Sequence, residues 1–373
     1  MDFTQGLKNE ERTAFALRGI YEHHGYKKVR VSKFEDYSLY IDNKNFLKTE
    51  NIITFMDLDG KLLALRPDVT LSIVKNTPSE PCACFEKLYY NEKVYRLAKH
   101  NHAYKEISQI GLECIGNIDE CAMIEVLGLA ADSLASVGGQ FILAVSHMGF
   151  WGGALEALGI KSDYYPSVMQ CIKQKNGTEL LRILKNLGIN NEYTEKISKI
   201  SRLSGDFDSV LEQAQGLVLN DTMNEALNEL KYLYSAFCGT KNGESLRLDF
   251  SVVNDLDYYN GIIFQGYIED VPRAVLLGGR YDKLLRKLGK NKGAVGFAMY
   301  IDELEHYYKC EAKTDADLLI IYDTIDDYKA FSALIKTYYD MGQRVRIERV
   351  VPQGFKCSNI LYYKDGALVK GDY

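Results

Sequence analysis

Three short groups of polar and aromatic residues in this sequence could hold a small polar ligand. They are Asp68 with Thr70, Gln109 with Glu113, and Tyr258 with Tyr259. Gln109 and Glu113 are four residues apart in an alternating stretch, so on a β-strand both side chains face the same side. Carboxylates accept hydrogen bonds and phenols donate them, which suits a ligand that carries positive charge and polar hydrogens.

Each group also has an ordinary structural interpretation. Asp68 follows Pro67 and precedes an apolar helical stretch, a pattern typical of a helix N-cap. Gln109 and Glu113 could form a solvated strand face, and the two tyrosines could lie in the core and on the surface. Taken one by one, the groups therefore predict structure more than function.

Composition and charge exclude several classes of protein. The 373 residues are 46% hydrophobic and 26% charged, as in a soluble globular protein of two or three domains. No apolar run reaches the roughly 18 residues of a membrane-spanning helix, and residues 1–15 resemble neither a secretory nor a transit sequence. We expect a cytoplasmic protein without membrane contacts. The net charge of −6 does not favour a nucleic-acid partner.

The eight cysteines do not predict a metal site. They include no CxxC pair, and Cys82 and Cys84 form a single CxC. A zinc site needs about four suitably spaced ligands, and His100 and His102 stand in a polar loop typical of a surface. We expect reduced cysteines, no metal and no cofactor.

Periodicity and turn residues predict the elements that position these groups. The first half should contain a helix ended by Gly25, a strand, a hairpin that turns at Asp59-Gly60, a helix after Pro67, two long strands, a helix and a strand. The corresponding ranges are 10–24, 26–35, 53–68, 69–76, 87–98, 105–117, 121–136 and 141–147.

The second half begins with a helical stretch, about 152–238, and then returns to strands. Residues 245–253, 258–268 and 276–279 read as strands, 280–289 as a helix, and 294–308 as a strand that becomes a helix. Residues 314–373 alternate strand, helix, strand, strand. The prediction is an α+β fold: a mixed, mainly antiparallel sheet flanked by helices over 1–310, a helical insertion, and a small C-terminal α/β module.

Several stretches resemble histidyl-tRNA synthetases, a class II synthetase family, and they follow the family's order. They are ALRPDVT, YRLAKHNHAYKEISQIGLECIG, LDYYNGIIF, LGGRYDKLLRKLG and AVGFAMYIDEL. The resemblance runs from Glu11 to Leu304 and implies a class II synthetase-like fold. It also implies that the six residues of the three groups line a histidine pocket, with the two carboxylates and Gln109 near the amino group and imidazole.

The departures from the family pattern concentrate on its ATP contacts. Three arginines bind the nucleotide in the family; Arg96 matches one, whereas Asn254 and Glu303 occupy the other two positions. The family's adenine-binding glutamate falls on Ala98, and its motif 1 proline falls on Ser32. A carboxylate near a triphosphate repels it, so the resemblance implies a lost ATP site beside a retained amino-acid site.

This combination is similar to a paralogous family, the regulatory subunits of ATP phosphoribosyltransferase. That resemblance implies a noncatalytic protein that acts with a short catalytic subunit in the first step of histidine biosynthesis. It implies L-histidine as an effector, a homodimer core within a hetero-octamer, and no aminoacylation. The C-terminal module would then be a degenerate anticodon-binding-like domain. Arg96 would be a residual anion contact or a structural ion-pair partner.

Two alternatives stay open at the level of sequence. The first is a divergent, active histidyl-tRNA synthetase in which Lys283, Arg286 or Lys287 replaces the lost cations. The second is a noncatalytic module of another system that binds histidine or tRNA. An aminoacylation assay distinguishes the first, and co-purification with a short phosphoribosyltransferase subunit distinguishes the second.

Overall fold

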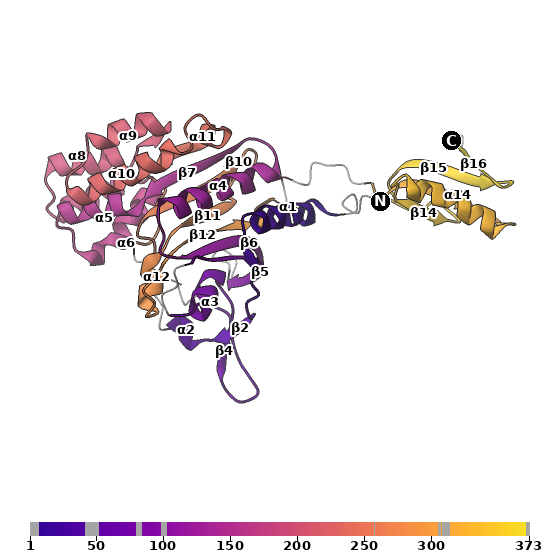
Figure 1. The fold of residues 1–373 in the computed structure, drawn as a ribbon, viewed down its shortest axis with the longest axis horizontal. Coiled ribbons are helices and arrows are strands. Elements are labelled where there is room, and N and C mark those ends of the chain that lie inside the picture. Colours follow the sequence, from indigo (N-terminus) through magenta and orange to yellow (C-terminus); the bar gives the residue numbers. More distant parts are fainter. Residues whose placement is uncertain are drawn as a thin grey trace. The chain divides into compact units, whose positions relative to one another are not determined.

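The computed structural model describes residues 7–41, 52–79, 84–97, 103–256, 258–304, 307 and 314–370 (Figure 1). Residues 13–304 belong to one compact unit and residues 314–370 belong to another. None of the helices in these ranges combines the length and apolar character that a bilayer-spanning segment requires.

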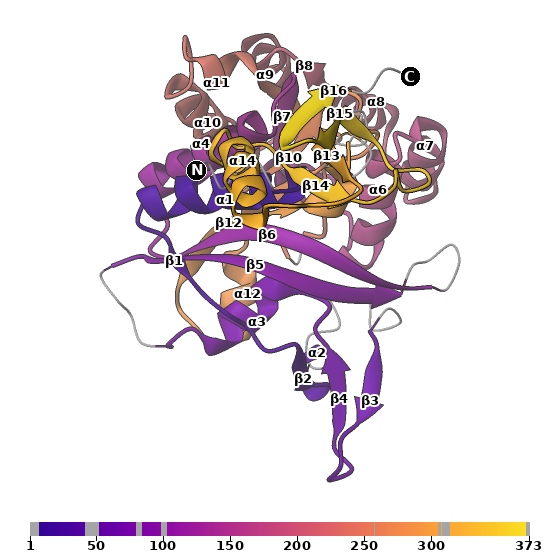
Figure 2. The ribbon, with the colours of Figure 1, turned by 90° about the vertical axis from the view of Figure 1, so that its right-hand side faces the viewer.

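The larger unit is built on a nine-stranded sheet with the order β1-β5-β6-β12-β11-β10-β7-β9-β8. Its pairs are antiparallel except for β1 with β5 and β7 with β9, which are parallel. Figure 2 shows the long β5 and β6 side by side. The strands are β1 (Lys27–Lys28), β5 (Glu86–Leu97), β6 (Tyr104–Gly116), β7 (Phe141–His147), β8 (Ser204–Gly205), β9 (Leu246–Asp249), β10 (Ile262–Ile268), β11 (Leu276–Arg280) and β12 (Gly293–Tyr300). The predicted mixed sheet, assembled from distant segments, is confirmed.

Helices cover both faces of this sheet, and alternate residues of the strands contact the two layers. Tyr89 on β5 packs against Tyr21 of one layer, whereas its neighbour Tyr90 packs into the cluster that holds the other layer. The first layer contains α1 (Asn9–His23) and α4 (Glu120–Val137), and the second contains α3 (Val69–Asn76) and α12 (Asp282–Lys287). Because both faces are covered, β6 is buried continuously from Gln109 to Gly116.

A three-stranded sheet precedes α3 and includes the predicted hairpin. Strands β3 (Thr54–Met56) and β4 (Leu62–Leu65) pair antiparallel, and β2 (Phe34–Asp36) pairs with the other edge of β4. Gly60 in the turn has φ +79°, which glycine adopts without strain. The short helix α2 (Ser38–Ile41) follows β2.

The prediction of one continuous strand over 26–35 is wrong. Only β1 and β2 form there, and the chain between them is not in a ladder. The side chain of Arg66, which is fully buried, donates to the carbonyls of Val31 at 2.7 Å and Ser32 at 3.0 Å. A side-chain donor thus replaces the neighbouring strand for this segment.

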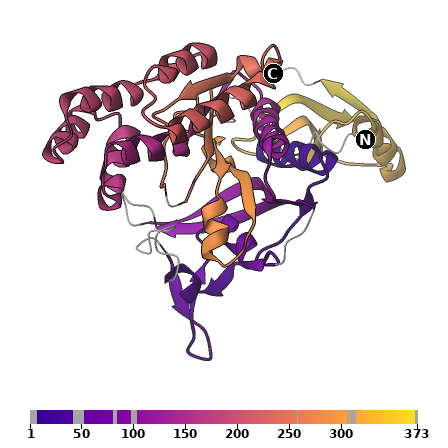
Figure 3. The same ribbon diagram turned by 60° about the vertical axis from the view of Figure 1, so that its left-hand side comes forward.

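The helical insertion lies along one end of the sheet (Figure 3). It begins at Met148, four residues before the predicted start, because strand β7 runs directly into a helix capped by His147. Helix α10 packs on α5. The helices are α5 (Met148–Ala157), the 3-10 turn η3 (Ser162–Tyr164), α6 (Tyr165–Lys173), α7 (Gly177–Asn186), α8 (Asn191–Ile200), α9 (Phe207–Gln215), α10 (Asp221–Ser235) and α11 (Lys241–Glu244). A further 3-10 turn, η4 (Ile301–Leu304), follows β12.

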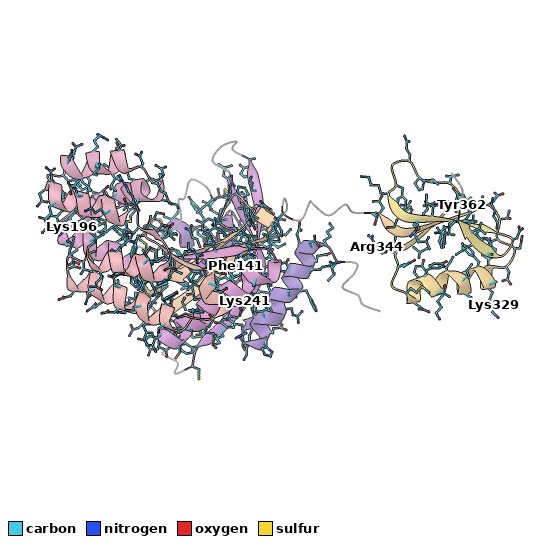
Figure 4. The ribbon with its side chains drawn as sticks, turned by 90° about the horizontal axis from the view of Figure 1, so that it is seen from above. Phe141, Lys196, Lys241, Lys329, Arg344 and Tyr362 are labelled. Carbon is cyan, nitrogen blue, oxygen red and sulfur yellow. The ribbon has the colours of Figure 1, made fainter. Side chains whose placement is uncertain are left out.

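The C-terminal unit is a four-stranded sheet, in the order β14-β13-β15-β16, packed against one helix. In Figure 4, Lys329 marks the helix and Tyr362 marks the sheet. Its elements are β13 (Ala316–Tyr322), α14 (Tyr328–Asp340), β14 (Val345–Glu348), β15 (Cys357–Lys364) and β16 (Ala367–Lys370). The predicted order of strand, helix, strand, strand is confirmed, with β16 as an additional short strand.

Arg66 ties the start of α3 to the main sheet. Beyond the two carbonyls of the segment between β1 and β2, it donates to the carbonyl of Lys93 at 2.8 Å and to Glu92 Oε2 at 2.9 Å. A buried guanidinium is costly unless its charge is paired and most of its donors are used. These four bonds use the two terminal nitrogens of Arg66, whereas its Nε–H has no hydrogen-bond partner among the described residues.

We expect Arg66→Leu to lower the free energy of unfolding by about 3–5 kcal/mol, because it leaves Glu92 without its partner and three carbonyls without donors. Urea denaturation followed by circular dichroism measures this. The matched control is Arg18→Leu, which removes an exposed pair with Glu22 and should cost less than about 1 kcal/mol. Equal losses in the two variants would contradict the assigned role of Arg66.

Candidate ligand cavity

A cavity of about 520 Å³ opens on the side of β5, β6 and β12 that α3 and α12 cover. The three residue groups singled out from the sequence come together there. Its lining includes all six predicted residues: Asp68, Thr70, Gln109, Glu113, Tyr258 and Tyr259. A volume in this range suits a small ligand such as an amino acid or a nucleotide.

Glu113 is the most constrained group in the cavity. It is 1% exposed, and its two oxygens accept hydrogen bonds from Thr70 Oγ1, at 2.7 Å, and from the hydroxyl of Tyr281. Burial raises the pKa of Glu113 to about 8, and the two hydrogen bonds only partly oppose this effect. At neutral pH, burial therefore favours the protonated form of this carboxyl group.

Glycine at position 296 makes room for this carboxyl group. Gly296 on β12 lies opposite Glu113 on β6, and a Cβ atom at position 296 would overlap Glu113 Oε2. Four residues further along the same ladder, Gln109 lies opposite Tyr300 and is 3% exposed. Gln109 and Glu113 thus share a buried face that points into the cavity, which rules out the solvated-face interpretation.

Asp68 combines the structural and the cavity-lining role. Its Oδ1 accepts from the backbone N–H of Leu71 at 2.8 Å and caps α3, so the N-cap interpretation is confirmed. Its Oδ2 lies 3.9 Å from a terminal nitrogen of Arg96, and the Nε–H of Arg96 donates to the Pro67 carbonyl at 2.8 Å. Arg96 therefore has structural partners while it also lines the cavity.

An aromatic wall closes another side of the cavity. The rings of Tyr258 and Tyr259 lie 4.5 Å apart between centroids, and Tyr281 lies 5.9 Å from Tyr258. Burial raises the pKa of all three phenols, so they stay protonated and can donate hydrogen bonds at physiological pH. This wall can stack a flat ring and bond its polar edge.

The positions that depart from the family's ATP contacts do not restore a cationic lining. Asn254 lines the cavity as a neutral residue, whereas Glu303 lies in η4, outside the lining, 3.5 Å from Arg273. Ala98 lies outside the described residues, as do His100 and His102. Among the described residues, the cations that line the cavity are Arg96 and Lys105.

The lysines and arginine considered as replacements do not line this cavity. Lys283 donates to the Leu256 carbonyl at 2.8 Å, and Arg286 lines a different cavity. Sequence reasoning missed Lys105 and Tyr281 as lining residues. Tyr281 belongs to the GGRYD segment. Its place as an aromatic residue between the charged Arg280 and Asp282 was the sequence signal that it could face the cavity.

His147 and Gly278 have structural contacts near the cavity-bearing sheet. The Nδ1 atom of His147 accepts a hydrogen bond from the Gly149 N–H at 3.0 Å, and its Nε2 lies 3.0 Å from Glu229 Oε2. These contacts give His147 a structural role. At Gly278, a Cβ would lie 2.5 Å from side-chain atoms of Phe264 and Phe297, so close packing explains this glycine. In the described ranges, no group of three His, Cys, Asp or Glu side chains is arranged to hold a metal ion.

Comparison with known proteins places this chain in a family. Residues 5–304 match the family model described as Histidyl-tRNA synthetase, so the chain has the histidyl-tRNA synthetase fold and belongs to that family. It is 30% identical over 283 residues to the ATP phosphoribosyltransferase regulatory subunit of Oceanobacillus iheyensis, covering 75% of this chain and 69% of that protein. Within the wider family, the chain belongs to the ATP phosphoribosyltransferase regulatory subunits.

Solved structures agree on the fold. A protein from Bacillus halodurans described as an ATP phosphoribosyltransferase regulatory subunit/histidyl-tRNA synthetase superposes with a TM-score of 0.79 at 22% identity, covering 95% of this chain and 93% of that chain. A chain of the ATP phosphoribosyl transferase (HisG:HisZ) complex from Thermotoga maritima gives a TM-score of 0.59 at 20% identity, with 78% and 97% covered. The predicted class II synthetase-like fold is confirmed.

We expect Glu113→Gln to change how stability depends on pH. Between about pH 4.5 and about pH 8, the carboxyl group of Glu113 is protonated in the folded protein and ionised in the unfolded chain. The contribution of Glu113 to the free energy of unfolding therefore falls as pH rises through that window. The variant lacks this loss. Its stability relative to wild type should therefore rise by about 1 kcal/mol per pH unit within the window.

Urea denaturation at pH 5, 6, 7 and 8 measures this difference. The control is Glu212→Gln on α9, an exposed glutamate outside the cavity, which should follow wild type at every pH. A constant difference between Glu113→Gln and wild type would mean that Glu113 is already ionised in the folded protein at pH 5.

Proposed function

We propose that this chain is the noncatalytic regulatory subunit of an ATP phosphoribosyltransferase, and that it binds L-histidine in the cavity between α3 and β6. One observation carries the proposal. The six residues that the family resemblance assigns to an amino-acid pocket all line one cavity, whereas Asn254 and Glu303 stand at two of the family's three phosphate-binding arginine positions.

The chemistry of the cavity fits histidine better than a neutral amino acid. Asp68 offers a carboxylate for the α-ammonium group, and Glu113 can accept a hydrogen bond from one imidazole nitrogen. The phenol groups of the aromatic wall can contact the other nitrogen and stack on the ring. Arg96 and Lys105 supply positive charge that can face the carboxylate of the ligand.

The same lining argues against aminoacylation. Histidyl-adenylate formation develops charge at the α-phosphate and at the leaving pyrophosphate, and cations must already be in place there. Glu303 is engaged by Arg273 and would oppose this charge if it turned toward the cavity. This supports a regulatory subunit over the alternative of a divergent synthetase.

The names of relatives support the identity of the partner. The Oceanobacillus protein is named a regulatory subunit, and the Thermotoga chain comes from a complex with a second component. We therefore propose a short catalytic subunit as the partner, with a homodimer of this chain as the core of a hetero-octamer. Histidine would inhibit catalysis by favouring one of two quaternary states, with a coupling of about 1–3 kcal/mol.

We expect free L-histidine to bind the purified chain and to inhibit the complex reconstituted with its short catalytic subunit. The positive charge of bound histidine favours the ionised form of Glu113. Glu113→Gln therefore removes a charge-assisted hydrogen bond that forms in the complex, and histidine affinity should fall about 10- to 100-fold. Titration calorimetry measures binding, and inhibition curves on the complex measure the response. The control is Glu303→Gln, a glutamate outside the cavity lining, which should bind histidine as wild type does.

The complex formed with Glu113→Gln should keep its uninhibited activity, because Glu113 is 1% exposed and offers no surface to a partner subunit. If Glu113→Gln and Tyr258→Phe both bind histidine and respond to it as wild type does, this cavity is not the sensor. Failure of the wild-type chain to co-purify with the short subunit would refute the partner instead.

We also expect no histidine-dependent exchange between ATP and pyrophosphate. Loss of one preorganised charge contact costs about 10²–10³ in rate, and two such contacts are absent here. The assay uses radiolabelled pyrophosphate, with a conventional histidyl-tRNA synthetase as the positive control. Clear exchange that Arg96→Ala abolishes would restore the synthetase alternative.

A further inference from the structure

A second cavity, of about 330 Å³, lies at the end of strands β6 and β12, away from the histidine-type cavity. Gly116 at the end of β6 and Gly293 at the start of β12 are paired neighbours and form part of its wall. A Cβ at position 293 would lie 2.9 Å from Asp282 Oδ1, so glycine keeps this space open. Its polar lining residues are Asn117, Arg280, Asp282, Arg286, Asn291 and Lys292.

Lys292 is a buried cation with unused donors. Its side chain is only 5% exposed, and its ammonium group pairs with Glu86 Oε1 at 2.9 Å. An ammonium group carries three N–H donors, and within the described ranges Glu86 is the side chain that Lys292 bonds. The other two donors of this nearly buried cation have no acceptor among the described residues, and Lys292 lines the cavity.

Arg280 is also held by a carboxylate while some of its N–H donors remain unused. Its Nε–H donates to Asp282 Oδ2 at 2.9 Å. Asp282 is also bonded by the Ala294 N–H at 3.0 Å and by the Asn260 amide at 3.2 Å. Arg280 is thereby fixed by one edge of its guanidinium group, and no residue in the described ranges accepts from its terminal nitrogens.

The lining carries more positive than negative charge, in a protein whose net charge is −6. Arg280 pairs with Asp282 and Lys292 pairs with Glu86, which leaves the third cation, Arg286, in excess. Arg286 is exposed, and its guanidinium group has no hydrogen-bonding partner among the residues that the structure describes. Together with the side-chain amides of Asn117 and Asn291, the three cations offer more N–H donors than the two oxygens of one carboxylate ligand can accept.

We propose that this cavity binds the phosphate group of a small molecule. A phosphate presents several acceptor oxygens and up to two negative charges, which match two guanidinium forks and an ammonium group. Lys292 and Arg280 form the fixed floor of the site, and Arg286 closes over it from α12. The enclosed volume is at the small end of the range for ligand sites, which favours a phosphorylated metabolite over a polymer backbone.

The probe is inorganic phosphate, titrated into the purified full-length chain in a calorimeter at constant ionic strength, with acetate titrated in parallel. We expect one saturable phosphate site per chain and weaker binding of acetate. Arg286→Ala should weaken phosphate binding about tenfold. Asn291→Asp, which adds a negative charge to an exposed position, should weaken it by at least about tenfold as well.

Two control variants make the test specific. Lys287→Ala, on the same helix but outside the cavity lining, should bind phosphate as wild type does. Arg96→Ala changes the other cavity and should also leave phosphate binding unchanged. The proposal is overturned if phosphate does not saturate, if acetate binds equally well, or if Arg96→Ala rather than Arg286→Ala removes the binding.

Discussion

The carboxyl group of Glu113 connects three separate parts of the chain. It projects from β6, accepts from Thr70 in the first turn of α3, and accepts from Tyr281 between β11 and α12. A buried carboxyl group without these partners would be strongly destabilising. The hydrogen bonds therefore fix how α3 and the β11–α12 junction sit against the sheet, and the shape of the cavity follows from that arrangement.

This constraint explains why neighbouring residues are small or rigid. Gly296 leaves space for the carboxyl group, and Gly111 on the same strand as Glu113 leaves space for the Tyr90 hydroxyl, which a Cβ would approach to 2.6 Å. Lys290 bonds the carbonyls of Val74, Lys75 and Thr77 and thereby ends α3 at its other terminus. Polar contacts thus hold helix α3 at both ends, and they fix the positions of Asp68 and Thr70 in the cavity lining.

Local patterns predicted much of this from the sequence, and long-range contacts account for what they missed. Alternation in 105–117 placed Gln109 and Glu113 on one face, and Pro67 with Asp68 marked the start of α3. Alternation in 26–35 misled, because Arg66, more than thirty residues away, takes the carbonyls that a strand neighbour would use. The contribution of Tyr281 was equally hidden, because its contact with Glu113 joins residues 168 positions apart.

The segment from Arg280 to Asp282 borders both cavities. Arg280 at the end of β11 and Asp282 at the start of α12 line the phosphate-type cavity, while Tyr281 between them bonds Glu113 in the other. Strand β12 also borders both cavities: Gly293 lines the phosphate-type cavity and Gly296 lines the histidine-type cavity, about 10 Å away along the strand. Two ligands that contact opposite sides of one short segment can influence each other only if that segment has two arrangements that they bind unequally. The glycine pair at 278 and 279, packed too tightly for any side chain at 278, makes a hinge within β11 an unfavourable place for such a change. The turn into α12 is held as well, by Tyr281 on Glu113 and by the Ala294 N–H on Asp282, so coupling between the two ligands would require these hydrogen bonds to change.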